Sequence, residues 1–385
     1  MFVQDFEQQF LFLLKASLNN EKLPDGYHFD VDRVFSLAMM HNLLPIIYIK
    51  ALECQENISA YKASVLKSCG RQIAKNNNFE ELFKRIIKAE ISVIVVKGPI
   101  CAFCYDVEYN RLSSDFDIVV SIDDKEKLHN FLLCEGFYQQ GESYICDQSG
   151  LYLEVSTRLG EGDDRFALNA DRAFGDFFVA QNQYGVYNSL KPEYHLVYLI
   201  YHAFKHFIGS GFGLKQIADI YMFIKQYNAQ LDFEMIYNMI DEIDIRSFAD
   251  NVFCLIDKLF DYKLPVYSEM NIDYICTDDF LADLLDAGVF GKSTENRLHS
   301  ATVVHNTVEN DGKKSFLKTI FPSAEYMKTK FSILHKLPFL LPLFWIVRLV
   351  QYVFSATSKD EDISPKKTIM IADSRIELIK KMGII

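Results

Sequence analysis

The amino-acid sequence predicts an α+β protein in which a small mixed β-sheet core lies between helical N-terminal and C-terminal lobes. Apolar residues recur at helical spacing over 1–80 and again over 192–260, and short β-branched runs bounded by turn residues lie between these regions. A chain of 385 residues, 50% of them hydrophobic, exceeds the usual size of one compact domain. We expect a helical lobe over 1–85, a core over 86–185, a helical lobe over 186–300 and an apolar, helical extension over 301–385.

The first elements are predicted to be helices because residues such as Phe6, Phe10 and Leu14 recur on one helical face. A longer helical pattern over about 58–90 leads into the apolar run 91–96. That run is rich in β-branched residues and is followed by Lys-Gly-Pro, so it predicts a buried strand that ends in a turn.

The core should continue as an α/β unit with a mixed sheet. The pattern predicts a short helix over about 99–105, a strand over 115–121, a helix from Asp123 to near Gly136, and strands within 137–147 and 151–155. The helical period returns at Pro192, with a Gly-rich break at 209–213. Residues 286–315 are rich in Gly, Ser, Thr, Asn and charge, which predicts a connector or mobile loop.

Charge and cysteine content narrow the classes of function. The net charge of −12 argues against broad attachment to nucleic acid, which relies on many Lys and Arg residues, but it is compatible with a small basic pocket. The N-terminus has no basic stretch followed by an apolar one, so we expect a cytoplasmic protein. The eight cysteines are spread through apolar segments, and the Cys101–Cys104 pair is predicted to be packing groups rather than zinc ligands.

Residues 331–354 form the most apolar window. Its uncharged stretch, 337–347, is 11 residues long and holds two prolines, whereas about 20 residues are needed to cross a bilayer. The favoured interpretation is a helix packed on the other lobes. The alternative is an interfacial membrane or partner-docking segment anchored by Trp345, Arg348 and Tyr352.

The most informative stretch is Ser114-Asp115-Phe116-Asp117. Residues two apart in a strand point to the same side, so the two carboxylates project together and the intervening Phe116 faces the other way. Like charges held this close need a cation, and hard oxygen ligands suit Mg²⁺ or Mn²⁺ bound together with substrate phosphates. A third acid is expected from a neighbouring strand. Glu154 is the candidate, and the alternative is an edge-strand glutamate that faces water.

These residues resemble the DNA polymerase β-type nucleotidyltransferase superfamily, and more narrowly an uncharacterised bacterial branch of it. The resemblance rests on Lys97-Gly98 after a strand, on Arg111 shortly before the Asp-X-Asp, and on the strand acid Glu154. It extends to 202–206, 211–219 and 340–345, and so covers most of the chain. Two departures are visible: Lys97-Gly98 replaces the usual Gly-Ser, and Ser156 stands where relatives tend to carry His.

The resemblance implies transfer of NMP from a nucleoside triphosphate to a hydroxyl acceptor with release of pyrophosphate. Asp115, Asp117 and Glu154 would hold the metal ions and carry catalysis. The residues implied to contact the nucleotide are Lys97, Gly98, Arg111, Ser114 and Lys215. The amides after Gly98, at the start of the following helix, would help Lys97 to hold the phosphates.

Three histidines share one predicted helical stripe, because the spacings of 7 and 4 place His195, His202 and His206 within about 20° of one another. They are interpreted as intradomain contacts or lining of the nucleotide cleft rather than as a metal site. Lys205 and Lys215 are candidates for phosphate or acceptor contacts, or else solvated side chains. Two functions compete with a transferase of small molecules, saccharides or proteins: a noncatalytic docking protein on this fold, and a toxin-type enzyme that modifies RNA or protein.

Overall fold

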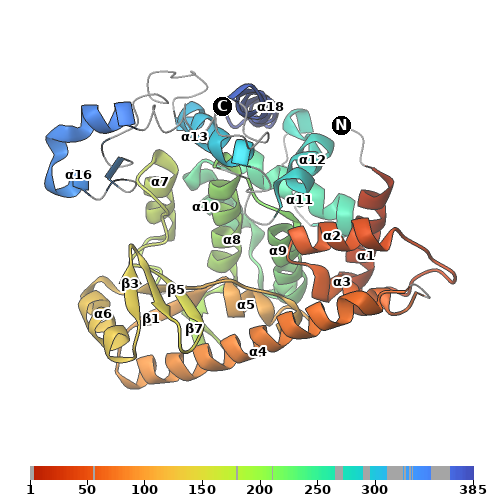
Figure 1. The fold of residues 1–385 in the computed structure, drawn as a ribbon, viewed down its shortest axis with the longest axis horizontal. Coiled ribbons are helices and arrows are strands. Elements are labelled where there is room, and N and C mark those ends of the chain that lie inside the picture. Colours follow the sequence, from red (N-terminus) through yellow and green to blue (C-terminus); the bar gives the residue numbers. More distant parts are fainter. Residues whose placement is uncertain are drawn as a thin grey trace.

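The computed structural model describes residues 4–54, 57–178, 181–209, 211–264, 272–288, 295–309, 333–347 and 365–385, together with residues 324, 327, 328 and 331. The N-terminal lobe is helical, as predicted. Its helices are α1 (Asp5–Asn19), α2 (Val31–Met40), α3 (Leu44–Ala51) and α4 (Ser59–Lys88). In Figure 1 the long helix α4 runs along one side of the molecule from α1–α3 to the sheet.

The core is a five-stranded mixed sheet with the order β1-β2-β5-β4-β3, in which only the β2–β5 pair is parallel. This confirms the predicted fold class. The strands are β1 (Val93–Val96), β2 (Phe116–Val120), β3 (Tyr138–Gln140), β4 (Ser143–Cys146) and β5 (Leu151–Ser156). Helices α5 (Gly98–Ala102) and α6 (Lys125–Cys134) connect them, close to the predicted ranges.

Strand β2 is buried on both faces, and this burial sets which way its acids point. On one face Phe116 stacks on Phe79 of α4 with ring centroids 4.1 Å apart. Because side chains alternate along a strand, Asp115 and Asp117 face the opposite side. A two-stranded hairpin of β6 (Gln181–Tyr184) and β7 (Tyr187–Leu190) packs near β1. The sequence pattern did not predict this hairpin, because its first strand is almost entirely polar.

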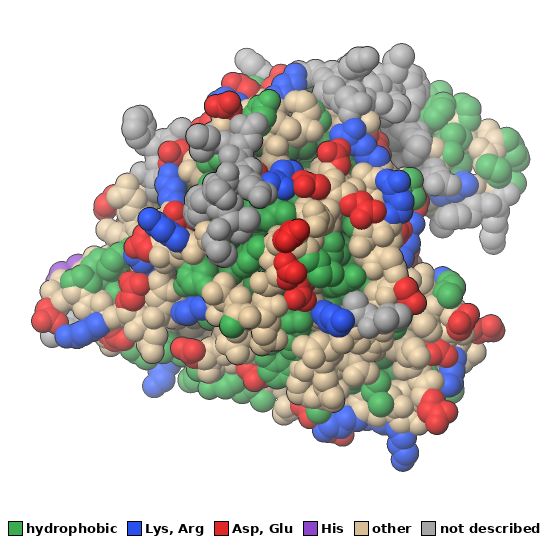
Figure 2. Space-filling model, turned by 180° about the vertical axis from the view of Figure 1, so that it is seen from behind, with side chains coloured by type: hydrophobic (Ala, Val, Ile, Leu, Met, Phe, Trp, Pro, Cys, Tyr) green, Lys and Arg blue, Asp and Glu red, His purple; other side chains and the backbone are tan. Residues whose placement is uncertain are grey.

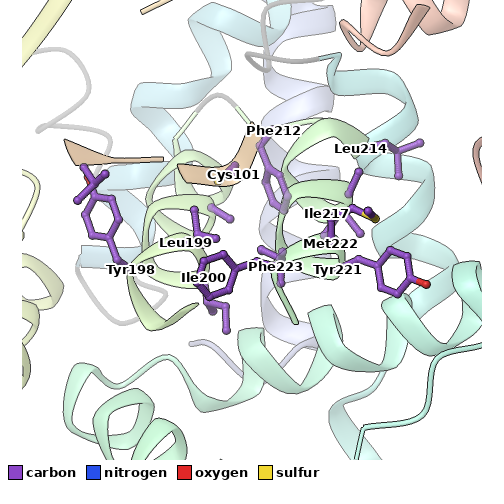
Figure 3. Close-up of a cluster of buried hydrophobic side chains, with 14 of the residues drawn as sticks. Cys101, Tyr198, Leu199, Ile200, Phe212, Leu214, Ile217, Tyr221, Met222 and Phe223 are labelled. Atoms are coloured by element: carbon purple, nitrogen blue, oxygen red, sulfur yellow. The ribbon is translucent and has the colours of Figure 1, made fainter. Parts of the chain in front are cut away.

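The second helical region covers the face of the sheet that carries these acids. Its helices are α7 (Arg165–Phe174), α8 (Pro192–Ile208), α9 (Leu214–Tyr227), α10 (Phe233–Ile243), α11 (Arg246–Phe260) and α12 (Thr277–Ala287). Figure 3 shows buried apolar side chains gathered between α8 and α9, among them Leu199, Phe212 and Phe223. This packing fixes the position of both helices against the core. The boundaries of the lobes near 85, 185 and 300 remain predictions.

The prediction of a connector over 286–315 is wrong for 295–309, which form helix α13 (Glu295–Glu309) packed against α18 (Pro365–Lys381). The polar composition indicated a loop, but several polar side chains of α13 are buried and paired within a helix. Arg297, only 2% exposed, forms ion pairs with Asp283 and Asp286 at 2.8 Å. Thr368 of α18 donates a hydrogen bond to Asn296.

The apolar window 331–354 is described in part. It contains α16 (Ile333–Lys336), the 3₁₀ turn Pro338–Leu340 and a further helical stretch over 341–347, while Arg348 and Tyr352 lie outside the described residues. The favoured expectation of a packed helix is not met for much of the described part, because Phe339 is 73% exposed and Ile346 58% exposed. Within the described residues, no helix has both the length and the apolar character needed to cross a membrane.

Candidate active site

A cavity of about 500 Å³ lies where the sheet meets α8 and α9, and nearly all of the predicted site residues line it. Its walls combine acidic, basic and imidazole side chains with a few apolar ones. The lining residues that the argument uses are Lys97, Gly98, Arg111, Ser114, Asp115, Asp117, Glu154, His202, His206, Lys215 and Asp219.

Three carboxylates form one side of this cavity. Asp117 lies on β2 and Glu154 on β5, and the parallel register of these strands places the two residues directly opposite each other. Asp115 immediately precedes β2 and faces the same cavity. The strand alternation expected from the sequence therefore brings the three acids together from segments almost 40 positions apart.

The carboxylates of this cluster repel one another because they carry like charge. Partial withdrawal from water and the neighbouring carboxylate of Asp117 raise the pKa of Glu154 to about 7. Glu154 is therefore partly protonated at neutral pH. A divalent cation at this position would favour the ionised form and release that proton.

Lys97 is the counter-ion of the cluster. Its Nζ lies 2.7 Å from Oδ1 of Asp117. Burial opposes the charge on the ammonium, but Asp117 and Glu161 outweigh this effect and raise the pKa of Lys97. The Lys97 backbone has φ 56° and ψ −125° at the sharp turn between β1 and α5. A side chain at this conformation is costly, and such strain persists where the surrounding structure holds it in place.

A second group of side chains adjoins Lys97 from the helical region. Nε2 of His202 on α8 lies 3.2 Å from Nζ of Lys97, and Nδ1 of His202 donates a hydrogen bond to Glu161 at 2.7 Å. Nε2 of His206 lies 3.0 Å from Nε2 of His202. Removal from water and the adjacent His202 lower the pKa of His206 to about 3, so that this imidazole is neutral.

Glu161 was not predicted from the sequence. Burial disfavours its charge, but His202 and Lys97 outweigh this effect and hold its pKa well below the usual range. It also accepts a hydrogen bond from the hydroxyl of Tyr198 at 3.1 Å. It follows β5 in a polar loop without periodicity, so no local pattern marks it.

Arg111 also lines the cavity and is paired with Asp219 of α9. Nε and Nη2 of Arg111 donate to the two carboxylate oxygens of Asp219 at 3.1 and 2.7 Å, and the buried Nη1 has no hydrogen-bond partner among the residues that the structure describes. Lys215 lies 3.1 Å from the same carboxylate, and the Tyr105 hydroxyl donates to it at 2.8 Å. Two cations thus share one anion, which leaves one excess positive charge in this group.

Asp219 was also absent from the predicted site. Burial would raise its pKa, but Arg111 and Lys215 outweigh this and hold it well below the usual range. Burial and the charge of Arg111 lower the pKa of Lys215. The spacing of Lys215 and Asp219, four residues apart on a helix, is the one signal in the sequence that could have indicated the pair.

The other predicted residues differ in their positions. Gly98 and Ser114 line the cavity, and the carbonyl of Ser114 accepts a hydrogen bond from Lys75. His195 is fully buried away from the cavity, where it contacts Ser189 at 3.1 Å, and burial lowers its pKa to about 3. Of the three histidines on the predicted stripe, His202 and His206 line the cavity and His195 does not. Lys205 also lies elsewhere and pairs with Asp164.

A different group of potential metal ligands lies beside Lys205. Asp164, His305 and Glu309 have ligand atoms within 4.8 Å of one another. Nζ of Lys205 already pairs with Oδ2 of Asp164, the oxygen that also faces His305. This group is therefore an ion-pair network between α7, α8 and α13. The cysteines are free thiols, and Cys101 and Cys104 are buried as the packing interpretation predicted.

Comparison with known proteins agrees with this geometry. A sequence model for the uncharacterised nucleotidyltransferase family matches residues 27–261, which is more than half of the chain and includes every residue of the cavity described above. No curated protein and no solved structure matched the chain. The chain belongs to the uncharacterised nucleotidyltransferase family.

Proposed function

We propose that this protein transfers NMP from a nucleoside triphosphate to a hydroxyl acceptor, with divalent metal and with release of pyrophosphate. One observation carries the proposal: Asp115, Asp117 and Glu154 face a single cavity that the cationic residues Lys97, Arg111 and Lys215 also line. Carboxylates on rigid strands beside phosphate-binding cations are the parts that phosphoryl transfer needs. The family match supports nucleotidyl transfer in general.

The donor set fits Mg²⁺ or Mn²⁺. The three acids offer only oxygen atoms, and a cation, the Lys97 ammonium, already lies against Asp117 at 2.7 Å. Asp115, Asp117 and Glu154 would hold the metal. Bound there, it would neutralise charge on the reacting phosphate and on the attacking and leaving oxygens.

The cationic walls suit a triphosphate. Lys97 lies next to the metal ligands, and Lys215 and Arg111 also line the cavity. Because Arg111 is held at two points by Asp219, its guanidinium is positioned before a ligand arrives. Preorganised donors of this kind cost little reorganisation when charge develops in the transition state.

The acceptor hydroxyl must lose a proton as it attacks. Glu154 is the candidate base by its position, because it lies directly opposite Asp117 in the carboxylate cluster, and bound metal would keep it ionised and so able to accept a proton. His202 is the other candidate, because Glu161 fixes its ring and its Nε2 lies beside Lys97. We assign the proton to Glu154 and a positioning role to the Glu161–His202 pair.

The test is a thermal-shift screen of ATP, GTP, CTP and UTP with Mg²⁺ or Mn²⁺, followed by measurement of pyrophosphate release with candidate hydroxyl acceptors. A ligand that binds the native state raises its apparent stability. We expect at least one triphosphate to raise the melting temperature only when metal is present. Absence of a metal-dependent shift with all four triphosphates would contradict the proposal.

A further inference from the structure

The apolar segment near the C-terminus has an unusual charge composition. Residues 327–358 contain Lys328, Lys330, Lys336 and Arg348, and they contain no Asp or Glu, although the whole chain carries 52 acidic residues and a net charge of −12. The most apolar stretch of an acidic protein is therefore locally cationic. A cationic, apolar segment has the composition that matches the two components of an anionic membrane interface, headgroup charge and hydrocarbon.

In the described part of this segment several large apolar side chains are exposed, although Leu334 is buried. The exposed fractions are 45% for Ile333, 39% for Leu337, 73% for Phe339, 53% for Leu343 and 58% for Ile346. Phe339 is more exposed than any other large apolar side chain in the described part of the chain. In Figure 1 the helix labelled α16 lies at the edge of the molecule, and Figure 2 shows hydrophobic side chains gathered on this outlying part.

The backbone geometry suits attachment to a surface. The segment folds as α16, the 3₁₀ turn Pro338–Leu340 and a helical stretch over 341–347, with prolines at 338 and 342. These short turns place apolar side chains outward without forming one long helix. Trp345, the single tryptophan of the chain, lies in this stretch and is half-buried. Tryptophan is enriched where an apolar environment meets a polar one.

We propose that residues 333–347 dock this protein on the surface of an anionic lipid bilayer. The local charge argues against a second copy as the occupant. A second copy would bring the same excess of positive residues in this part of the sequence, and this like charge disfavours pairing of the two segments. This inference is independent of nucleotidyl transfer, since none of these residues lines the cavity.

The experiment measures cosedimentation of the full-length protein with phosphatidylcholine vesicles and with mixed phosphatidylcholine–phosphatidylglycerol vesicles. We expect partitioning onto the anionic vesicles to exceed that onto neutral ones by roughly tenfold or more, and to fall as salt screens the headgroups. Emission of Trp345 should shift to shorter wavelength only with the anionic vesicles, because the indole then leaves water.

Matched variants separate the apolar and the cationic contributions. Phe339→Asp combined with Leu343→Asp should lower binding roughly tenfold or more. The control is Ile122→Asp combined with Leu66→Asp, two apolar residues that are 69% and 61% exposed on other elements. Lys336→Glu combined with Arg348→Glu should also abolish the preference for anionic lipid. Its control, Lys62→Glu with Lys67→Glu, changes two exposed lysines of α4.

Several outcomes would overturn the proposal. Equal partitioning onto both kinds of vesicle would show that lipid charge plays no part in binding. Absence of binding to either kind would show that the segment does not dock on a membrane. Loss of thermal stability in Phe339→Asp with Leu343→Asp, with vesicle binding unchanged, would show that the segment packs against the protein. Dimers detected by light scattering, lost in the same variant and without vesicle binding, would assign the surface to a second copy.

Discussion

Asp115 and Asp117 lie two positions apart and face the same cavity, yet their surroundings differ. Asp115 is half-buried, while Asp117 is 8% exposed and bears the ammonium of Lys97 at 2.7 Å. An asparagine at either position removes one ligand charge. At position 117 it also leaves Lys97, whose side chain is 14% exposed, without its closest partner, so the two substitutions should have different effects on stability.

We expect both Asp115→Asn and Asp117→Asn to abolish metal-dependent binding of a nonhydrolysable triphosphate. Asp115→Asn should leave the free energy of unfolding nearly unchanged, whereas Asp117→Asn should lower it by about 1–3 kcal/mol. Calorimetric titration with Mn²⁺ and urea unfolding measure the two quantities. Unchanged nucleotide affinity in both variants would show that these two acids do not form a metal site.

Lys97 combines an ammonium that faces the cavity with a backbone conformation that glycine adopts freely. Lys97→Ala should weaken triphosphate binding far more than monophosphate binding, because the lost charge faces the outer phosphates. Lys97→Gly removes the same charge and also relieves the strain at φ 56°. The free energy of unfolding of Lys97→Gly should therefore exceed that of Lys97→Ala by about 1–2 kcal/mol. Equal losses of affinity for both nucleotides would show that Lys97 does not face the outer phosphates.

At the scale of elements, the cavity depends on how α9 is joined to the segment before β2. Asp219 of α9 is 4% exposed and connects to Arg111, Lys215 and Tyr105. These contacts span more than 100 positions of the chain between Arg111 and Asp219. The network therefore fixes the distance between the cationic wall and the acidic strand, and it does so without contacting the carboxylate cluster itself.

Asp219→Asn should destabilise the protein by about 3–5 kcal/mol near neutral pH, because it leaves two buried cations without their anion. The folded-state pKa of Asp219 lies below its ordinary value of 3.8. Its contribution is thus complete above about pH 4 and is lost as the pH falls further. The difference in unfolding free energy between wild type and variant should narrow below that pH, and urea unfolding at several pH values measures it. The control is Asp123→Asn at an exposed position, and a difference that does not change with pH would contradict this account.

At the scale of the whole molecule, the C-terminal helix closes over the helical region. Arg375 of α18 donates to the backbone carbonyls of Phe207 and Gly209 at the end of α8, and it faces Asp283 of α12. Burial lowers the pKa of Arg375 to about 10. The last helix of the chain is thereby connected to the helix that carries His202 and His206.

Arg375→Met should lower the free energy of unfolding by about 2–4 kcal/mol, because two backbone carbonyls lose a charged donor and the Asp283 carboxylate loses a counter-ion 3.5 Å away. Thermal unfolding of this variant beside Lys367→Met, which alters an exposed residue of the same helix, provides the comparison. Equal melting temperatures for the two variants would mean that α18 is held by apolar packing alone.

The local pattern of the sequence determined the fold class, the facing of Asp115 and Asp117, and the position of Lys97 at the end of a strand. Each of these follows from periodicity or turn chemistry within about ten residues. The pattern failed where local composition opposed the structure, as in the polar strand β6 and in α13, whose buried Arg297 and Asn296 find partners elsewhere in the chain.

Only the tertiary structure decided which charges meet. The pairing of Glu161 with His202 and of Arg111 with Asp219 joins residues 41 and 108 positions apart. The tertiary structure also buries His195 in the core, whereas His202 and His206 on the same helix line the cavity. Sequence periodicity specifies a face of a helix or strand, but the partner of that face depends on how the whole chain closes. The electrostatics of the site, which arise from desolvation and from distant counter-charges, therefore exist only once the chain has folded.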